Sequence, residues 1–192
     1  MSDRLEIWRL NPLAFFAPVR TTAFLLCALL ALAAGSMPAQ AFDKAGYKAR
    51  AETTLAELNT KQLADSKATL ARLDEMIAIG IVGMKEYGAK NPKYAKLMDA
   101  AAADCQAIKD MSDVQMEEKW GETGWGGDAV GVPLKTLADF GIERAYLELG
   151  VGPAHQYIFV KKWETARKAR WLEQARDEAV ELLKHLNDIP GK

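Results

Sequence analysis

Apolar residues recur at helical spacing along most of the chain after residue 42. Three successive stripes consist of Tyr47, Ala51, Thr54, Leu55 and Leu58, of Leu70, Leu73, Ile77, Ile81 and Met84, and of Tyr94, Leu97, Met98, Ala101, Cys105 and Ile108. Residues three and four positions apart share one face of an α-helix, so each stripe predicts a helix with one buried side. No stretch alternates with the period of two that a half-buried strand requires. The pattern, in a region rich in the helix former alanine, predicts an all-α fold.

Capping residues indicate where two of these helices begin. Asn91-Pro92 places a capping amide before a proline at the first helical position, where the missing N–H costs nothing. Ser112 and Gln115 have the spacing of a capping box, in which each side chain bonds the other residue's backbone N–H. This box predicts a short helix that leads to Trp120.

The region 43–89 is compatible with one long helix or with two shorter ones. Asp65 and Ser66 are possible caps, yet the apolar stripes on either side of them project onto roughly the same face. The segment from Met76 to Met84 is apolar all round, which is typical of the middle of a bundle. Gly80 and Gly83 in this segment predict the close approach of a neighbouring helix.

The last third of the chain predicts two further helices. Residues 134–149 form an amphipathic helix that Gly150 and Gly152 are expected to end, and Pro153 then opens a last helical segment that reaches Pro190. Between Trp120 and this region, residues 121–133 hold five glycines. We therefore expect an antiparallel bundle of four to five helices with one loop rich in glycine and tryptophan.

The amino-terminal region has the features of a cleavable signal peptide. Residues 23–34 are an uninterrupted run of 12 apolar residues, followed by Ala39-Gln40-Ala41, an A-x-A cleavage site. The run matches a signal core of roughly 7–15 residues and is shorter than the roughly 20 that a spanning helix needs. We expect residues 1–41 to be a signal peptide, with a true start possible near Val19, and residues 42–192 to be one helical domain in the periplasm.

Charge and cysteine content exclude several classes of protein. The chain has 25 basic and 26 acidic residues and a net charge of −1, so it carries no electrostatic footprint for nucleic acid. With 49% hydrophobic residues, it is not a disordered chain. Only Cys105 remains after residue 41, which excludes an internal disulfide and a zinc site built from four cysteines. We expect Cys105 to lie in the core, with a redox thiol, a metal ligand or an intermolecular disulfide as the alternatives.

No catalytic or cofactor motif is present in the sequence. Cys105 lacks the second cysteine and the histidine of a covalent haem site, and no Glu-x-x-His pair indicates a di-iron centre. The glycines of the loop neither follow a predicted strand nor precede Lys-Ser or Lys-Thr, so they do not resemble a phosphate-binding loop.

The remaining candidates for a site lie in the glycine-rich loop and near His155. Trp120, Glu122, Trp125 and Asp128 belong to this loop or flank it, and His155 is expected in the first turn of the helix that begins at Pro153. There the helix dipole favours a neutral imidazole, suited to a hydrogen-bonded core position, to a metal or haem ligand or to a general base. The helix 134–149 is about 24 Å long, so the loop must fold back to reach His155.

These observations favour an exported helical-bundle accessory or binding protein for a small ligand, a metal or haem, or a partner protein. His155 is the strongest metal candidate, and the cofactor is undetermined. A small envelope enzyme that uses His155 with a loop carboxylate is the first alternative. A chaperone-like or structural protein that binds a partner is the second.

Overall fold

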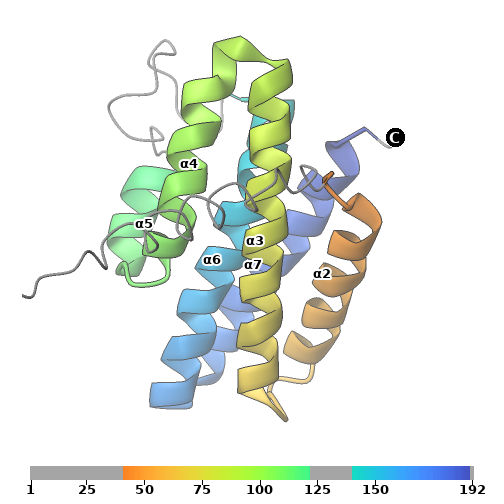
Figure 1. Ribbon diagram of the computed structural model, residues 1–192. Coiled ribbons are helices and arrows are strands. Elements are labelled where there is room, and N and C mark those ends of the chain that lie inside the picture. Colours follow the sequence, from red (N-terminus) through yellow and green to blue (C-terminus); the bar gives the residue numbers. More distant parts are fainter. Residues whose placement is uncertain (1–40, 122–139, 191–192) are drawn as a thin grey trace, which may run out of the picture. The chain divides into compact units, whose positions relative to one another are not determined.

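The computed structural model describes residues 41–121 and 140–190, and the expected all-α fold is confirmed for them. The chain divides into the units Met1–Ala39 and Gln40–Lys192, and every described residue belongs to the second unit. Its elements in chain order are α2 (Lys44–Leu58), α3 (Ser66–Lys90), the 3-10 turn η1 (Pro92–Tyr94), α4 (Ala95–Ile108), α5 (Asp113–Trp120), α6 (Ile142–Ala166) and α7 (Ala169–Asp188) (Figure 1). Within these residues there are six α-helices rather than four to five.

The long helices α3 and α6 form the centre of this unit. Both contact α4, α6 packs against α7 and α5, and α2 packs against α3 and α7. Ser66 near the start of α3 donates to Glu164 near the end of α6, and Tyr87 near the end of α3 donates to Glu143 near the start of α6. These two helices are therefore antiparallel, as expected for a bundle.

The apolar stripes fill two adjoining core clusters. One cluster lies among α2, α3, α6 and α7 and includes Tyr47, Leu73 and Leu172, all nearly inaccessible to solvent. The other lies among α3, α4, α5 and α6 and includes Cys105 and Trp120. The helices thus bury the faces that the hydrophobic pattern indicates.

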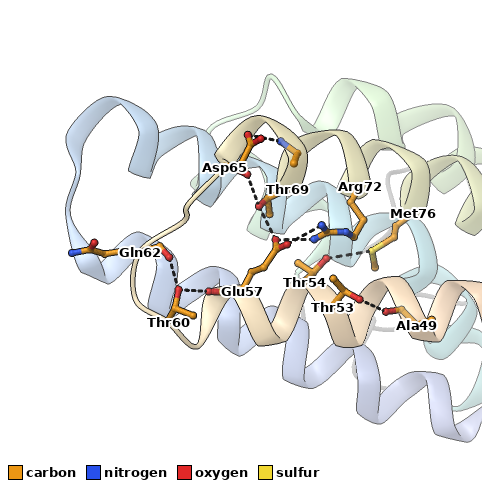
Figure 2. Close-up of polar contacts among 11 residues, drawn as sticks. Ala49, Thr53, Thr54, Glu57, Thr60, Gln62, Asp65, Thr69, Arg72 and Met76 are labelled. Atoms are coloured by element: carbon orange, nitrogen blue, oxygen red, sulfur yellow. Dashed lines mark hydrogen bonds and ion pairs between the residues drawn. The ribbon is translucent and has the colours of Figure 1, made fainter.

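The region 43–89 forms two helices, joined by a short turn. Asp65 caps α3 by accepting a hydrogen bond of 3.0 Å from the backbone N–H of Ala68, and Lys61 in the turn has a left-handed φ of 58°. Arg72 holds the end of α2 against α3 through two hydrogen bonds to Glu57, of 2.7 and 2.8 Å (Figure 2). This hydrogen bonding lowers the pKa of Glu57. A bidentate pair of this kind adds geometric specificity to the contact between the two helices.

Both caps predicted after residue 90 lie at helix boundaries in the structure. The capping box of Ser112 and Gln115 is present in full at the start of α5. Pro92 begins η1, but the Asn91 side chain donates to the Tyr87 carbonyl at 2.9 Å and so ends α3 instead of capping the next helix.

The predicted helix stop at Gly150 and Gly152 is wrong. Helix α6 runs without interruption through both glycines and Pro153 to Ala166, and it begins at Ile142. The expected start at 134 and most of the loop 121–133 lie outside the described residues. The actual break falls at Arg167, which has a left-handed φ of 52°, and α7 begins at Ala169.

Tertiary packing explains why α6 continues. A Cβ on Gly80 would lie 2.0 Å from the Leu149 carbonyl oxygen, so the α3 and α6 backbones touch at this crossing, as Gly80 and Gly83 predicted. Proline removes the N–H that would bond the carbonyl of residue i−4. That carbonyl, on Leu149, instead accepts a hydrogen bond from the Tyr47 hydroxyl of α2. Gly152 has no Cβ to clash with the Pro153 ring, which further permits the helical conformation.

No helix among the described residues has the length and apolar character needed to cross a membrane.

Candidate functional site

His155 lies in the middle of α6 rather than in a first helical turn. Its side chain is buried, and Nδ1 lies 3.2 Å from Oε1 of Glu178 on α7. The ring stacks at a tilt on Phe159, with 4.5 Å between ring centres, and Nε2 is buried with no hydrogen-bond partner. The dipole argument based on a helix start therefore does not apply to this residue.

An acidic cleft of about 450 Å³ adjoins His155. Helix α5 contributes Asp113, Glu117 and Glu118, and α7 contributes Asp177 and Glu178. Asp113 bonds Lys162, which lowers the pKa of its carboxyl group. The cleft thus brings His155 together with carboxylates from α5 and α7. In the described part of the chain, no group of three or more His, Cys, Asp or Glu side chains is arranged to hold a metal ion.

The other predicted site residues do not join His155 in the described structure. Trp120 ends α5 with its ring 2% exposed, and its indole N–H donates to Asp104 at 3.0 Å, so it is a satisfied core residue. Glu122, Trp125 and Asp128 lie outside the described residues. A site that combines them with His155 stays a prediction.

A cavity of about 650 Å³ was missed by the sequence analysis. It lies where the start of α2 meets the ends of α3 and α7 and the first turns of α6. Its lining residues are Phe42, Asp43, Lys44, Ala45, Lys48, Glu86, Tyr87, Lys90, Tyr146, Ile189 and Pro190. We call it the end cavity. Its walls come from four distant parts of the sequence, so no motif marks it.

Two tyrosines form the aromatic wall of the end cavity. Tyr87 and Tyr146 stack with 4.2 Å between ring centres, and the Tyr87 hydroxyl donates to Glu143 at 3.2 Å. Burial raises the pKa of both phenols, and the nearby Glu143 carboxylate raises that of Tyr87 further. Both hydroxyls therefore remain protonated hydrogen-bond donors at neutral pH.

The charged groups of the end cavity differ in whether they already have a hydrogen-bond or ion-pair partner. Asp43 accepts from the Gly46 N–H as the cap of α2, and Glu86 accepts from the Phe42 N–H at 2.7 Å. Lys44 donates to the Ile189 carbonyl. Lys90 is exposed and forms no ion pair with any described residue. The cavity therefore combines apolar walls with an available ammonium group.

A partly buried polar seam runs along the interface of α6 and α7. Arg144 bonds Glu181 at 2.7 Å and lies 3.6 Å from Glu148. Burial, together with the neighbouring Glu178 carboxylate, raises the pKa of Glu148 to about 8. Glu148 and His155 both face Glu178, so the seam connects the core of α6 with the acidic cleft.

Comparisons of this chain with protein-family models, with curated proteins and with solved structures find no match. The class of protein is therefore defined by its architecture alone: an all-helical bundle with an apolar end cavity and a separate acidic cleft. The end cavity and the acidic cleft are its two candidate binding sites in the described part of the chain.

Proposed function

We propose that this protein is an exported binding protein that holds a small, mainly apolar molecule with an anionic group in the end cavity. Export rests on the apolar run of residues 23–34 and on the A-x-A site that ends at Ala41. The binding role rests on the cavity itself, which is the observation that carries the proposal.

The size and lining of the end cavity support a small-molecule ligand. Ligand pockets measure about 300–1,000 Å³ and combine apolar walls with a few polar groups. The end cavity, at about 650 Å³, has Phe42, Tyr87, Tyr146 and Ile189 as apolar walls. The acidic cleft is smaller, and five of its nine lining residues are Asp or Glu. Of the two, the end cavity suits an apolar molecule.

The charge of the lining favours an anionic group on the ligand. The cavity is lined by Lys44, Lys48 and Lys90 and by two carboxylates, Asp43 and Glu86. Both carboxylates already accept backbone N–H groups, whereas Lys90 has no ion-pair partner among the described residues. An anionic headgroup beside Lys90 would gain a charge-assisted contact.

Titration with the fluorescent probe anilinonaphthalene sulfonate tests the proposal, because the probe is apolar with one anionic group. We expect saturable binding and displacement by dodecanoate but not by dodecyltrimethylammonium. Ala45→Trp fills the cavity from the exposed side of α2 and should abolish binding. Ala49→Trp, at an exposed position on the same helix outside the cavity, is the matched control. Equal binding by both variants contradicts the proposal.

A charge variant tests the headgroup. Lys90→Gln removes the ammonium group at the cavity. It should weaken dodecanoate binding by about tenfold, which corresponds to a loss of about 1.4 kcal/mol of binding free energy. Lys67→Gln makes the same change at an exposed position near the other end of α3. Equal effects of the two variants would show that the anion does not bind beside Lys90.

The acidic cleft supports a second candidate function, the binding of a cationic ligand near His155. Glu117 and Glu118 line it and form no ion pair with any described residue. Calorimetric titration with spermidine tests this function, and Glu118→Gln should weaken any binding observed. The cleft also supplies a carboxylate beside His155 for the enzyme alternative, but Nε2 of the ring is buried, which does not favour proton transfer to a ligand.

The chaperone-like alternative has less support. Among the described residues, the exposed large hydrophobic side chains are Val114 and Val180, on different helices. Isolated exposed side chains do not form the broad apolar patch that a partner-binding surface of this kind requires.

A further inference from the structure

We propose that cleavage after Ala41 creates an α-ammonium group on Phe42 that forms an ion pair with Glu86, anchoring the start of α2 and adding one positive charge to the end cavity. This inference rests on the export that forms part of the proposed function. It concerns what the new amino terminus does in the folded protein.

The backbone nitrogen of Phe42 is already held against Glu86. Its N–H donates to Oε1 of Glu86 over 2.7 Å, the distance typical of a charge-assisted hydrogen bond. The Phe42 side chain is 8% exposed and packs on the ring of Tyr47, with 5.9 Å between ring centres. A Cβ on Gly83 would lie 3.1 Å from the Phe42 ring, so α3 provides the seat for this side chain. By contrast, Ala41 is exposed.

The residues that follow leave this nitrogen little freedom. Asp43 caps α2, and its side chain accepts the Gly46 N–H at 2.9 Å. Lys44, the first residue of α2, donates to the carbonyl of Ile189, just beyond the end of α7. The nitrogen of Phe42 thus lies between a buried ring and a capped helix. Both neighbours come from residues after 41.

The chemistry of cleavage converts this contact into an ion pair. Hydrolysis adds water across the Ala41–Phe42 peptide bond: the hydroxyl goes to the carbonyl carbon of Ala41, and a proton goes to the nitrogen of Phe42. The released amine takes a second proton from solvent below its pKa of about 7.7–8.0. One N–H of the ammonium keeps the bond to Glu86, and the pair now joins opposite charges.

The ion pair changes the charge of the end cavity. The titratable or charged groups that line it are Asp43, Lys44 and Lys48 from the start of α2, Glu86, Tyr87 and Lys90 from α3, and Tyr146 from α6. Before cleavage, the Phe42 nitrogen that bonds the Glu86 carboxylate is a neutral amide. After cleavage the ammonium neutralises this carboxylate, so the lysines dominate the field that an anionic ligand meets.

Expression of the full chain in a bacterial host tests the cleavage. The intact mass of protein recovered from the envelope should correspond to a chain that begins at Phe42. A product that keeps residues 1–41, or that begins at another residue, overturns the inference.

The pKa of the Phe42 amine in the processed protein tests the ion pair. We expect NMR titration to place it about one unit above the usual value of about 7.7–8.0, a tenfold gain in proton affinity. Glu86→Gln should return it to that value. Glu75→Gln, which breaks the exposed pair of α3 with Arg50 of α2, is the matched control and should leave it raised. An unshifted amine in the wild-type protein, or equal shifts in both variants, overturns the inference.

The two proposals can fail separately. A raised amine pKa that depends on Glu86, in a protein that binds neither the sulfonate probe nor dodecanoate, supports the ion pair and contradicts the ligand proposal. Probe binding together with an unshifted amine supports the ligand proposal and contradicts the ion pair.

Discussion

Single glycines determine how closely α3 and α6 approach. Gly80→Ala would place a methyl group 2.0 Å from the backbone oxygen of Leu149, which no side-chain rotation can relieve. We expect this variant to lose about 3 kcal/mol of unfolding free energy, although alanine is the better helix former. Gly88→Ala on the same helix is the control, because its Cβ would meet Ala95 and Met98 at 3.3 Å. Urea unfolding measures both, and similar stabilities would show that α3 and α6 can separate at little cost.

The position of Cys105 in the core lowers the reactivity of its thiol. It is fully buried, and burial raises the pKa of its thiol to about 12. We expect slow labelling by a thiol reagent in the native protein and rapid labelling in denaturant, because the thiolate is the reactive form. Cys105→Ser should cost about 1–3 kcal/mol by burying a hydroxyl without a partner. Rapid native labelling would show an accessible thiol.

His155 occupies the buried core position that the sequence allowed as one alternative, although it lies in the middle of α6 rather than at a helix start. If His155 served only to bind a ligand, His155→Ala would leave stability intact, whereas the buried ring and its contact with Glu178 predict a loss of about 2 kcal/mol. Unfolding midpoints of wild type and variant decide between the two expectations. An unchanged midpoint, together with loss of spermidine binding, would show that His155 is a binding residue rather than a structural one.

Among the helices, α6 shows how a helix can continue through a segment that contains two glycines and a proline. The carbonyl of Leu149 loses its helical partner at Pro153 and is satisfied by Tyr47, a residue 102 positions earlier in the chain. Burial raises the pKa of Tyr47 well above its usual value, so the hydroxyl is a permanent donor. The continuity of α6 therefore depends on the docking of α2.

A double-mutant cycle tests this dependence. Tyr47→Phe should cost about 1–3 kcal/mol, since it leaves a buried carbonyl without a donor. In a Pro153→Ala background the new N–H can bond Leu149 within the helix, so the same change should cost clearly less. Chemical unfolding of the four proteins gives the coupling energy. Additive effects would mean that the Tyr47 hydroxyl does not replace the missing helical bond.

In the molecule as a whole, the partly buried seam between α6 and α7 makes the free energy of unfolding depend on pH. The pKa of Glu148 is raised to about 8 by burial and by the nearby Glu178 carboxylate. A carboxyl group with a raised pKa binds its proton more tightly in the folded state. The stabilisation of the folded state by the neutral Glu148 carboxyl is therefore fully present below about pH 4.3, the pKa of this group in the unfolded chain. This stabilisation is lost as the pH rises toward about 8.

Glu148→Gln isolates this contribution. The amide resembles the neutral acid, so the stability of the variant relative to wild type should increase between about pH 4.3 and 8 and then level off. At pH 7 the difference should be on the order of 2–3 kcal/mol, since the Glu148 side chain is 16% exposed. Urea unfolding across this range measures it. A constant difference would show that Glu148 ionises normally in the folded protein.

Features that depend on local backbone preference and on one-sided burial could be predicted from the sequence alone. The stripes of Tyr47, Leu73 and Leu97 predicted buried helix faces because residues three and four apart share a face. The Ser112 capping box was predictable because both of its hydrogen bonds lie within four residues.

Features that depend on contacts between residues far apart in the chain could not be predicted in this way, because they arise only when the helices pack. Gly150 and Pro153 break a helix in isolation, but a hydroxyl from α2 and the close crossing of α3 stabilise α6 through them. Arg167 ends α6 although the residue type gives no stop signal. The end cavity and the Phe42 contact with Glu86 likewise join residues far apart in the chain, and such proximity arises from packing rather than from any local pattern.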